Sequence, residues 1–177
     1  MLIPVKIYRA LTIAILTMTL FGQASFAADT ETDAAVDAVR GFNAAIGARD
    51  MDAALAFLAE GSVALQLRAV HPGMSDNPPL TADLRKNWQM VAAILFPTTN
   101  AYVREVTVTN ATADGEVATV WVDTTTRTDR KNESETMALK FSEVYLLVKK
   151  SDGWKIAVVA DNRQPDNIAV TPDDGAD

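Results

Sequence analysis

The positions of apolar residues divide the chain into a helical first half and a strand-rich second half. Between residues 33 and 48, apolar side chains recur every three or four positions, which predicts an amphipathic helix. The same spacing predicts two further helices, one over Met51–Ala59 and one that begins after Thr81 and ends at Phe96. A short strand is predicted over residues 62–67, and the proline-rich stretch 69–80 is expected to be a loop.

Residues suited to helix ends support these boundaries. Asp50 precedes the second helix, and aspartate is a preferred N-cap because its carboxylate accepts hydrogen bonds from free backbone N–H groups. Gly61 is expected to stop that helix, and Pro97 is expected to end the third.

Strand patterns dominate from Tyr102 onward. Residues 102–109 and 116–126 are rich in valine and threonine, with a turn predicted over residues 110–115. A charged loop is predicted over residues 127–135, and the segment Phe141–Asn162 then reads as a hairpin. Helices followed by an antiparallel meander predict an α+β fold, with three N-terminal helices packed on a curved antiparallel sheet.

The closing hairpin also allows a prediction of its register. A three-residue loop with Gly153 in the left-handed conformation leaves one hairpin face almost wholly apolar, which we expect to face the core. The pairs on that face are Lys150–Trp154, Val148–Ile156, Leu146–Val158 and Val144–Ala160. The other face, with Tyr145 and Leu147, is polar only at its ends, which would suit a homodimer interface or cover by a loop.

The first 27 residues have the three parts of a secretory signal. Lys6 and Arg9 supply positive charge, an uncharged apolar run covers Ala10–Phe21, and small residues stand at Ser25 and Ala27. We expect cleavage after Ala27 and export of a soluble protein to the periplasm or outside the cell, with no membrane contact after cleavage. The alternative is a membrane anchor, but the apolar run is shorter than the roughly 20 residues that span a bilayer.

Composition narrows the classes of partner. The chain has 16 basic and 23 acidic residues and a net charge of −7, and two of the basic residues lie in the predicted signal. An acidic surface repels nucleic acids and anionic lipids, so we expect neither as a partner. The chain has no cysteine and therefore no disulfide. One domain is predicted over residues 28–164, followed by a disordered tail over 165–177.

Two segments resemble a known family. The stretch FNAAIGARDMDAALAFLAEGSVAL is similar to the helix, turn, helix and strand that open proteins of the NTF2-like superfamily, which includes SnoaL-like and ketosteroid-isomerase-like domains. The stretch EVYLLVKKSDGWKIAVVADNR is similar to the hairpin that closes them. The resemblance implies a cone of helices around a curved sheet, an apolar pocket at the open end, and frequent homodimers. A fold of this kind supports many functions, so function has to be argued from the site.

The site of the ketosteroid isomerases is matched poorly. Where the resemblance implies a tyrosine in the first helix the chain has Phe42, and where it implies a catalytic aspartate the chain has Gln66. The second acid falls near Ser142, beside Glu143. Because the reaction needs a base and an oxyanion donor, the resemblance does not extend to that activity.

Other candidate chemistry is sparse. His71, the single histidine, Asp123 and Asp161 are candidate acid/base residues, although a surface or strand-end position explains each more simply. No clustered ligand spacing indicates a metal, and no phosphate-binding loop or nucleophile elbow indicates a cofactor or a hydrolase site.

Aromatic residues are the candidates for ligand binding. Trp88, Tyr102 and Trp121 are expected to line the pocket, whereas Phe42 and Trp154 are expected to fill the core. The favoured function is a dimeric module that binds a small apolar ligand or another protein. The alternative is an isomerase, dehydratase or hydrolase for a small apolar substrate, with His71 or a pocket aspartate as acid or base.

Overall fold

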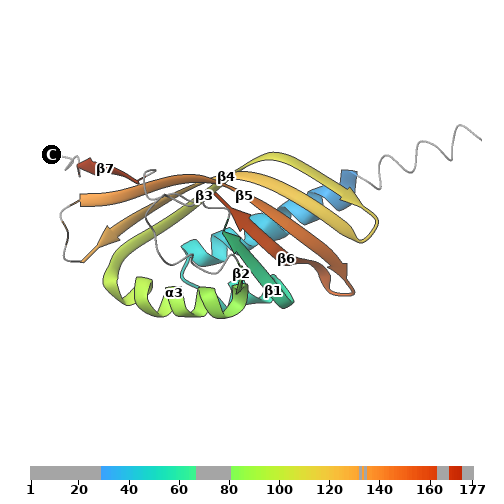
Figure 1. Ribbon diagram of the computed structural model, residues 1–177, viewed down its shortest axis with the longest axis horizontal. Coiled ribbons are helices and arrows are strands. Elements are labelled where there is room, and N and C mark those ends of the chain that lie inside the picture. The colour runs from blue at the N-terminus through green and yellow to red at the C-terminus, as the bar shows by residue number, and fades with distance from the viewer. Residues whose placement is uncertain (1–28, 67–80, 132, 134, 163–167, 173–177) are drawn as a thin grey trace, which may run out of the picture.

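The computed structural model describes residues 29–66, 81–131, 133, 135–162 and 168–172 (Figure 1). Three helices and seven strands follow one another in these ranges: the N-terminal helix 29–47, α2 Met51–Ala56, β1 Leu58–Gln66, β2 Thr81–Asp83, α3 Leu84–Thr98, β3 Thr99–Asp114, β4 Val117–Arg130, β5 Glu135–Lys150, β6 Gly153–Asp161 and β7 Ile168–Pro172.

The strands form one curved sheet in the order β2-β1-β6-β5-β4-β3, and β7 pairs with β5 beyond β6. Strands β3 to β6 form the predicted antiparallel meander. The sheet is mixed rather than wholly antiparallel, however, because β1 runs parallel to β6. A parallel neighbour needs a crossover connection, and the chain supplies one between β1 and β6 in the form of α3 and the meander.

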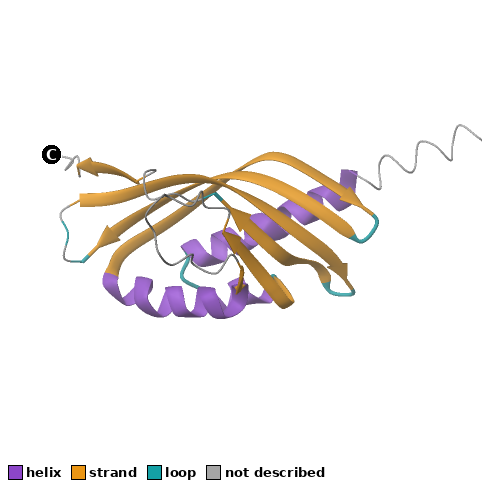
Figure 2. Cartoon of the chain, in the orientation of Figure 1, coloured by secondary structure: helices purple, strands orange, loops and turns teal. Residues whose placement is uncertain are grey.

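The helices lie on the concave side of this sheet. The N-terminal helix runs beneath the long strands and α3 crosses below it, so the molecule has a sheet layer over a helix layer (Figures 1 and 2). The predicted α+β class is confirmed. No described helix is both long and apolar enough to cross a bilayer.

Several predicted boundaries were wrong, and tertiary pairing explains the shifts. Asp50 caps α2 as predicted, and its carboxylate accepts a hydrogen bond from Ala53 N at 3.0 Å. The helix ends at Ala56 rather than Ala59, because Leu58 already pairs with Ile156 of β6. Gly61 therefore lies within β1 and does not end the helix.

The same holds for the third helix and the third strand. Asp83 caps α3, which runs to Thr98 and contains Pro97, while the predicted cap Thr81 belongs to β2. The turn predicted over residues 110–115 is mostly strand, because a bulge between Val108 and Asn110 lets β3 continue to Asp114. The chain reverses at Gly115, whose φ of 58° is left-handed.

The hairpin register was correct at one end and wrong at the other. Leu146 pairs with Val158 and Val144 with Ala160, as predicted. Nearer the turn, Lys150 pairs with Gly153, so the register shifts between Leu146 and Leu147. Gly153 is left-handed as expected, with a φ of 111°.

The predicted core face of the hairpin is also wrong, even where the register is correct. Tyr145, Leu147, Trp154 and Ile156 are buried, whereas Leu146 and its even-numbered neighbours are half-buried on the convex side. The register irregularity breaks simple alternation in β6, so Ile156 faces inward with Leu147 while Val158 faces outward with Leu146.

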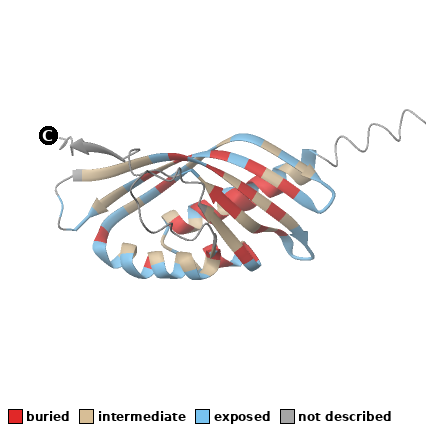
Figure 3. Cartoon of the chain, viewed as in Figure 1, coloured by how far each residue is buried: buried red, intermediate tan, exposed pale blue. Residues whose placement is uncertain are grey.

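The apolar core lies where the sheet covers the N-terminal helix (Figure 3). Val39 and Ile46 of that helix and Val120, Leu147 and Ile156 of the strands are completely buried. Burial of a side chain of this size contributes about 1.5–3 kcal/mol. This half of the concave face is therefore filled by side chains.

Three predicted segments lie wholly or partly outside the described residues. The signal at residues 1–27 and the loop at 69–80 lie wholly outside them. Of the tail expected to be disordered, Ile168–Pro172 is described, and it forms β7 against Glu135–Leu139 of β5.

Candidate functional site

A buried polar cluster lies next to the apolar core on the concave face. It consists of Arg104 on β3, Thr124 on β4, Glu143 and Tyr145 on β5, and Asn43 on the N-terminal helix. All five are at least nine-tenths buried. Positions two apart on a strand share a face, which is why Glu143 and Tyr145 point the same way.

Glu143 is the centre of this cluster. Its Oε2 accepts hydrogen bonds from Arg104 Nη2 at 2.5 Å, Thr124 Oγ1 at 2.7 Å and the Tyr145 hydroxyl at 2.9 Å. Charge-assisted hydrogen bonds of this kind, from a cation or a hydroxyl to a carboxylate, are shorter and stronger than neutral ones. Glu143 therefore serves as the counter-ion of Arg104.

Asn43 connects the cluster to the N-terminal helix. Its Nδ2 donates to the backbone oxygen of Val39 at 2.8 Å and to the Tyr145 hydroxyl at 3.2 Å. Its Oδ1 accepts a hydrogen bond from Arg104 Nε. Both ends of the amide are thereby used to hold Arg104 and Tyr145 in place.

The protonation states follow from burial and charge. Burial alone would lower the pKa of Arg104, but the negative charge of Glu143, helped by Tyr145 and Tyr102, raises it well above its ordinary value. Burial also raises the pKa of the Tyr145 hydroxyl, and the charge of Glu143 adds to that effect. Arg104 therefore stays charged and Tyr145 stays protonated at neutral pH.

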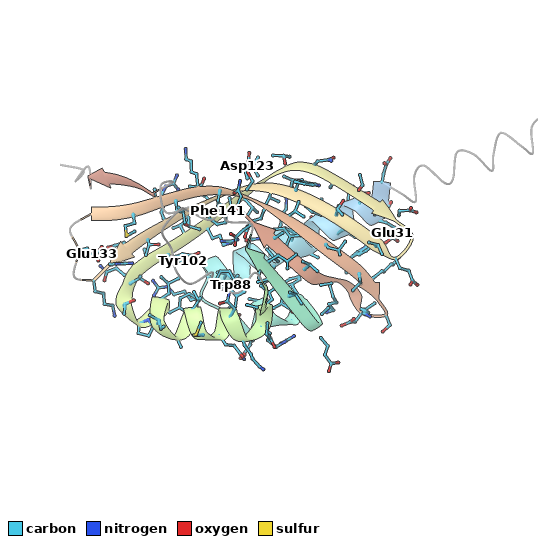
Figure 4. All side chains as sticks on the ribbon, in the orientation of Figure 1. Glu31, Trp88, Tyr102, Asp123, Glu133 and Phe141 are labelled. Carbon is cyan, nitrogen blue, oxygen red and sulfur yellow. The ribbon has the colours of Figure 1, made fainter. Side chains whose placement is uncertain are left out.

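Aromatic rings flank the guanidinium. The Cζ atom of Arg104 lies 5.5 Å from the ring centre of Trp88 and 5.6 Å from that of Phe141, both within the range of cation–π attraction. Trp88 comes from α3 and meets Phe42 edge to face at 6.0 Å. Figure 4 shows Trp88, Tyr102 and Phe141 together on the concave side.

One nitrogen of Arg104 stands apart from this network. Nη1 is buried and has no hydrogen-bond partner among the described residues, although Nε and Nη2 are both used. A buried donor without an acceptor costs about 1–3 kcal/mol, and more when it is charged. Trp88 and Tyr102, which pack against the core, are only half-buried.

Asp161 extends the cluster toward the end of β6. It stands directly opposite Glu143 in the antiparallel ladder, so the two carboxylates share the concave face. Asp161 is half-buried, whereas Glu143 is buried.

Comparison with known proteins depends on structure alone. No protein-family model matches the chain, and no curated protein matches its sequence. Solved structures do match. A candidate aromatic ring hydroxylase from Novosphingobium aromaticivorans superposes with a TM-score of 0.61 at 14% identity, over 80% of this chain and 94% of that one.

Two further solved structures give the fold its name. A ketosteroid isomerase-like protein from Erwinia carotovora atroseptica has a TM-score of 0.55 at 20% identity, over 75% of this chain and 95% of that one. An NTF2-like protein of unknown function from Shewanella baltica has a TM-score of 0.55 at 13% identity, over 77% and 95%. The chain has the NTF2-like fold. At these identities the match concerns the fold and not the activity.

The NTF2-like sheet separates the predicted ligand-binding residues. Trp88 and Tyr102 lie on the concave side, as expected, but Trp121 lies on the convex face and its side chain is 50% exposed. Trp121 pairs with Val144 on β5, which faces the same way. Even positions of β4 face the core, so an odd-numbered tryptophan points outward.

The candidate acid/base residues are separated as well. Asp123 is exposed on the convex face, where its Oδ1 accepts a hydrogen bond from Ser142 Oγ at 2.9 Å (Figure 4). Asp161 lies on the concave side next to Glu143. His71 lies outside the described residues.

The ketosteroid-isomerase positions can now be placed in the NTF2-like cone. Phe42 is completely buried in the core and has no hydroxyl to offer. Ser142 faces outward, so Glu143 is the acid that occupies the inward position on β5. In this chain that acid is bound to Arg104.

Sequence reasoning missed Arg104 and Asn43, and it placed Tyr145 on the hairpin face opposite the predicted core. Arginine and asparagine in amphipathic segments usually point to solvent, and only the register of β3 to β5 shows that these residues meet. The one available signal was parity, since Arg104 lies two positions from Tyr102 on the same strand and therefore on its face. No group of three or more metal-binding side chains occurs in the described part of the chain.

Proposed function

We propose that this protein binds a small, flat and mainly apolar ligand on the concave side of its sheet. The carrying observation is the buried Arg104 Nη1, without a partner among the described residues, flanked by the rings of Trp88 and Phe141. Ligand sites typically combine apolar and aromatic walls with a few convergent polar groups. The similarity to a candidate aromatic ring hydroxylase supports a ring-shaped ligand.

The chemistry of the cluster favours binding over catalysis. A general base needs a free lone pair and a pKa near the working pH. Oε2 of Glu143 is occupied by hydrogen bonds from Arg104, Thr124 and Tyr145, and the raised pKa of Tyr145 keeps its proton in place. These groups hold each other in position and hold Arg104 for a ligand.

A pair of tryptophan substitutions tests the proposal. N-phenyl-1-naphthylamine, an uncharged aromatic dye that fluoresces in apolar surroundings, serves as the probe. We expect Trp88→Leu to weaken dye binding about tenfold, the equivalent of about 1.4 kcal/mol, because a stacking wall is lost. Trp121→Leu, on the convex face, is the matched control and should leave binding unchanged. Equal affinities in both variants and the wild type would exclude the concave site.

The alternative is an enzyme, and the position of Asp161 favours it. This carboxylate lies opposite Glu143 on the concave face, beside the cluster that holds Arg104. A carboxylate and a fixed cationic donor on one surface are the parts needed to remove a proton and stabilise the resulting negative charge.

Matched aspartate variants test this alternative. Asp161→Asn should abolish any turnover found with ring halides or ring alcohols. Turnover is measured as the release of halide or the loss of water. Asp123→Asn, on the convex face, should retain that turnover. Equal activity in the two variants would remove Asp161 from a catalytic role.

A homodimer is proposed through the convex face. Trp121 and Val117 are 50% and 48% exposed there, beside half-buried Leu146 and its neighbours. Clustered exposed apolar residues are typical of interaction surfaces. Trp121→Glu should convert a dimer to a monomer in sedimentation-velocity experiments, and an unchanged sedimentation coefficient would contradict the proposal.

Export to the periplasm or the medium is proposed from the signal at residues 1–27. In a bacterial host the mature protein should begin at Ala28 and appear in the periplasmic fraction, as measured by intact mass. Retention of residues 1–27 would show instead that the segment anchors the protein.

A further inference from the structure

We infer that Glu143 sets the charge preference of the site, so that Arg104 Nη1 binds an uncharged oxygen acceptor and discriminates against carboxylates. This inference depends on the proposed function, since it specifies the polar group of the ligand bound there. A lone arginine ordinarily favours anions, so the preference has to come from the groups around it.

The ion pair supplies the first argument. The side chains of Arg104 and Glu143 are 0% and 3% exposed, and Nη2 lies 2.5 Å from Oε2. Their charges therefore cancel in a place that water does not screen. A ligand carboxylate at Nη1 would leave a net negative charge buried, and an uncompensated buried charge is strongly unfavourable.

The surrounding groups supply the second argument. Asp161 stands opposite Glu143 on the same face, so it adds negative charge near the site. Asn43 and Thr124 bring dipoles, and both face Arg104 or Glu143 already. No second cation takes part in the hydrogen bonds of this cluster in the described part of the chain.

The free nitrogen supplies the third argument. The N–H groups of Nη1 have no acceptor among the described residues, and a carbonyl oxygen accepts such a charge-assisted hydrogen bond without bringing a charge of its own. The flanking Trp88 and Phe141 rings suit a planar group beside that carbonyl. An aromatic ketone or amide meets these conditions, and an aromatic acid does not.

Three naphthalenes of nearly equal shape test the inference on the wild-type protein. The probes are 2-acetylnaphthalene, with an uncharged carbonyl, 2-ethylnaphthalene, with no oxygen, and 2-naphthoate, with a carboxylate. Titration calorimetry at neutral pH should give the ketone at least tenfold higher affinity than the hydrocarbon, with naphthoate weaker than the ketone. Naphthoate as the strongest ligand would overturn the inference, and so would equal affinities for ketone and hydrocarbon.

Two variants test the roles of the individual residues. Glu143→Gln keeps a side chain of the same shape but removes the charge, so we expect it to raise the affinity for naphthoate at least tenfold relative to the affinity for the ketone. A merely structural role for Glu143 would weaken all three ligands together. Arg104→Lys keeps the charge beside Glu143 but removes Nη1, and should reduce the ketone to the affinity of the hydrocarbon.

The outcomes separate this inference from the proposed function. If 2-ethylnaphthalene binds but the ketone binds no better, the concave site exists and only the role of Arg104 is wrong. If none of the three binds the wild type, the proposed function itself fails. Thermal melts followed by circular dichroism establish that each variant folds. If a variant does not fold, the three titrations of the wild-type protein decide whether the inference holds.

Discussion

Two arginine–glutamate pairs lie on opposite faces of the sheet, each with one member on β3, and have different environments. Arg104 and Glu143 meet on the concave face and are almost completely buried, whereas Arg127 and Glu105 meet on the convex face and are 51% and 59% exposed. Arg104 and Glu105 are neighbours in sequence. The alternation of a strand is therefore enough to decide whether a charge shapes an interior site or belongs to a solvated surface.

Breaking each pair in the same way should show the largest difference. Arg104→Met leaves Glu143 buried without its cation, which should lower the free energy of unfolding by about 3–5 kcal/mol. Arg127→Met removes an exposed pair and should cost about 1 kcal/mol or less. Equilibrium urea denaturation measures both. Similar losses of stability in the two variants would show that an arginine–glutamate pair contributes equally on the concave and the convex face.

Two adjacent leucines of β5 extend the comparison to apolar side chains. Leu147 is completely buried, so Leu147→Ala should destabilise the protein by about 2–5 kcal/mol. Leu146 faces the convex side and is half-buried, so Leu146→Ala should cost about 1 kcal/mol. Guanidinium denaturation midpoints, at equal m-values, give the loss in the free energy of unfolding for each variant. A larger loss of stability for Leu146→Ala than for Leu147→Ala would support the core face predicted from the sequence, which contained Leu146.

The Tyr145 hydroxyl offers a finer test of the buried cluster. Tyr145→Phe removes its hydrogen bond to Glu143 and should cost about 1–3 kcal/mol at neutral pH. Burial raises the pKa of this hydroxyl, so the unfolded chain loses the proton at lower pH than the folded one. The contribution of the protonated Tyr145 hydroxyl to the free energy of unfolding is therefore present below about pH 10 and falls as the pH rises above that value.

Melting temperatures of the wild type and Tyr145→Phe between pH 8 and pH 11 check this sign. The wild type should lose stability above pH 10 more steeply than the variant. Parallel curves would mean that Tyr145 ionises in the folded protein as readily as in the unfolded one.

The smallest effect is expected at Glu31, where the N-terminal helix meets the β5–β6 hairpin. Its carboxylate accepts hydrogen bonds from Lys149 Nζ at 2.6 Å and Trp154 Nε1 at 3.1 Å, and these, chiefly the one from Lys149, hold the pKa of Glu31 below its ordinary value. Because the folded-state pKa is lowered, the stabilisation is present above about pH 4.5 and is lost as the pH falls through that lowered value.

Glu31→Gln should therefore lower the melting temperature slightly at pH 7 and make no difference at pH 3. Glu60→Gln, at an exposed position of β1, is the control. A melting-temperature difference for Glu31→Gln that persists unchanged at pH 3 would contradict the assignment.

The periodicity of the sequence predicted the fold class well because the long elements are strongly patterned. The N-terminal helix and the meander follow directly from apolar spacing and from Asp152–Gly153 in the turn. Boundaries were less accurate, since the pairing of Leu58 with β6 and the irregularities in β3 and β6 depend on contacts distant in sequence.

The candidate site was harder to predict for a related reason. Trp88 and Tyr102 could be chosen by residue type, but Trp121 could not be separated from them without the parity of β4. Arg104 and Glu143 lie far apart in the sequence, and nothing local indicates that two charged residues share one buried position. A register error of one residue is enough to move such a pair from the interior to the surface.

The pairing of β7 has a consequence for aggregation. In the first part of β5, residues 137–139 have β4 on one side and β7 on the other, while β6 covers only the later part of the strand. Removing Ile168–Pro172 would turn that stretch into an open edge, with backbone N–H and C=O groups ready to pair with a strand of another chain. The last described segment thus covers the backbone of this one stretch of β5.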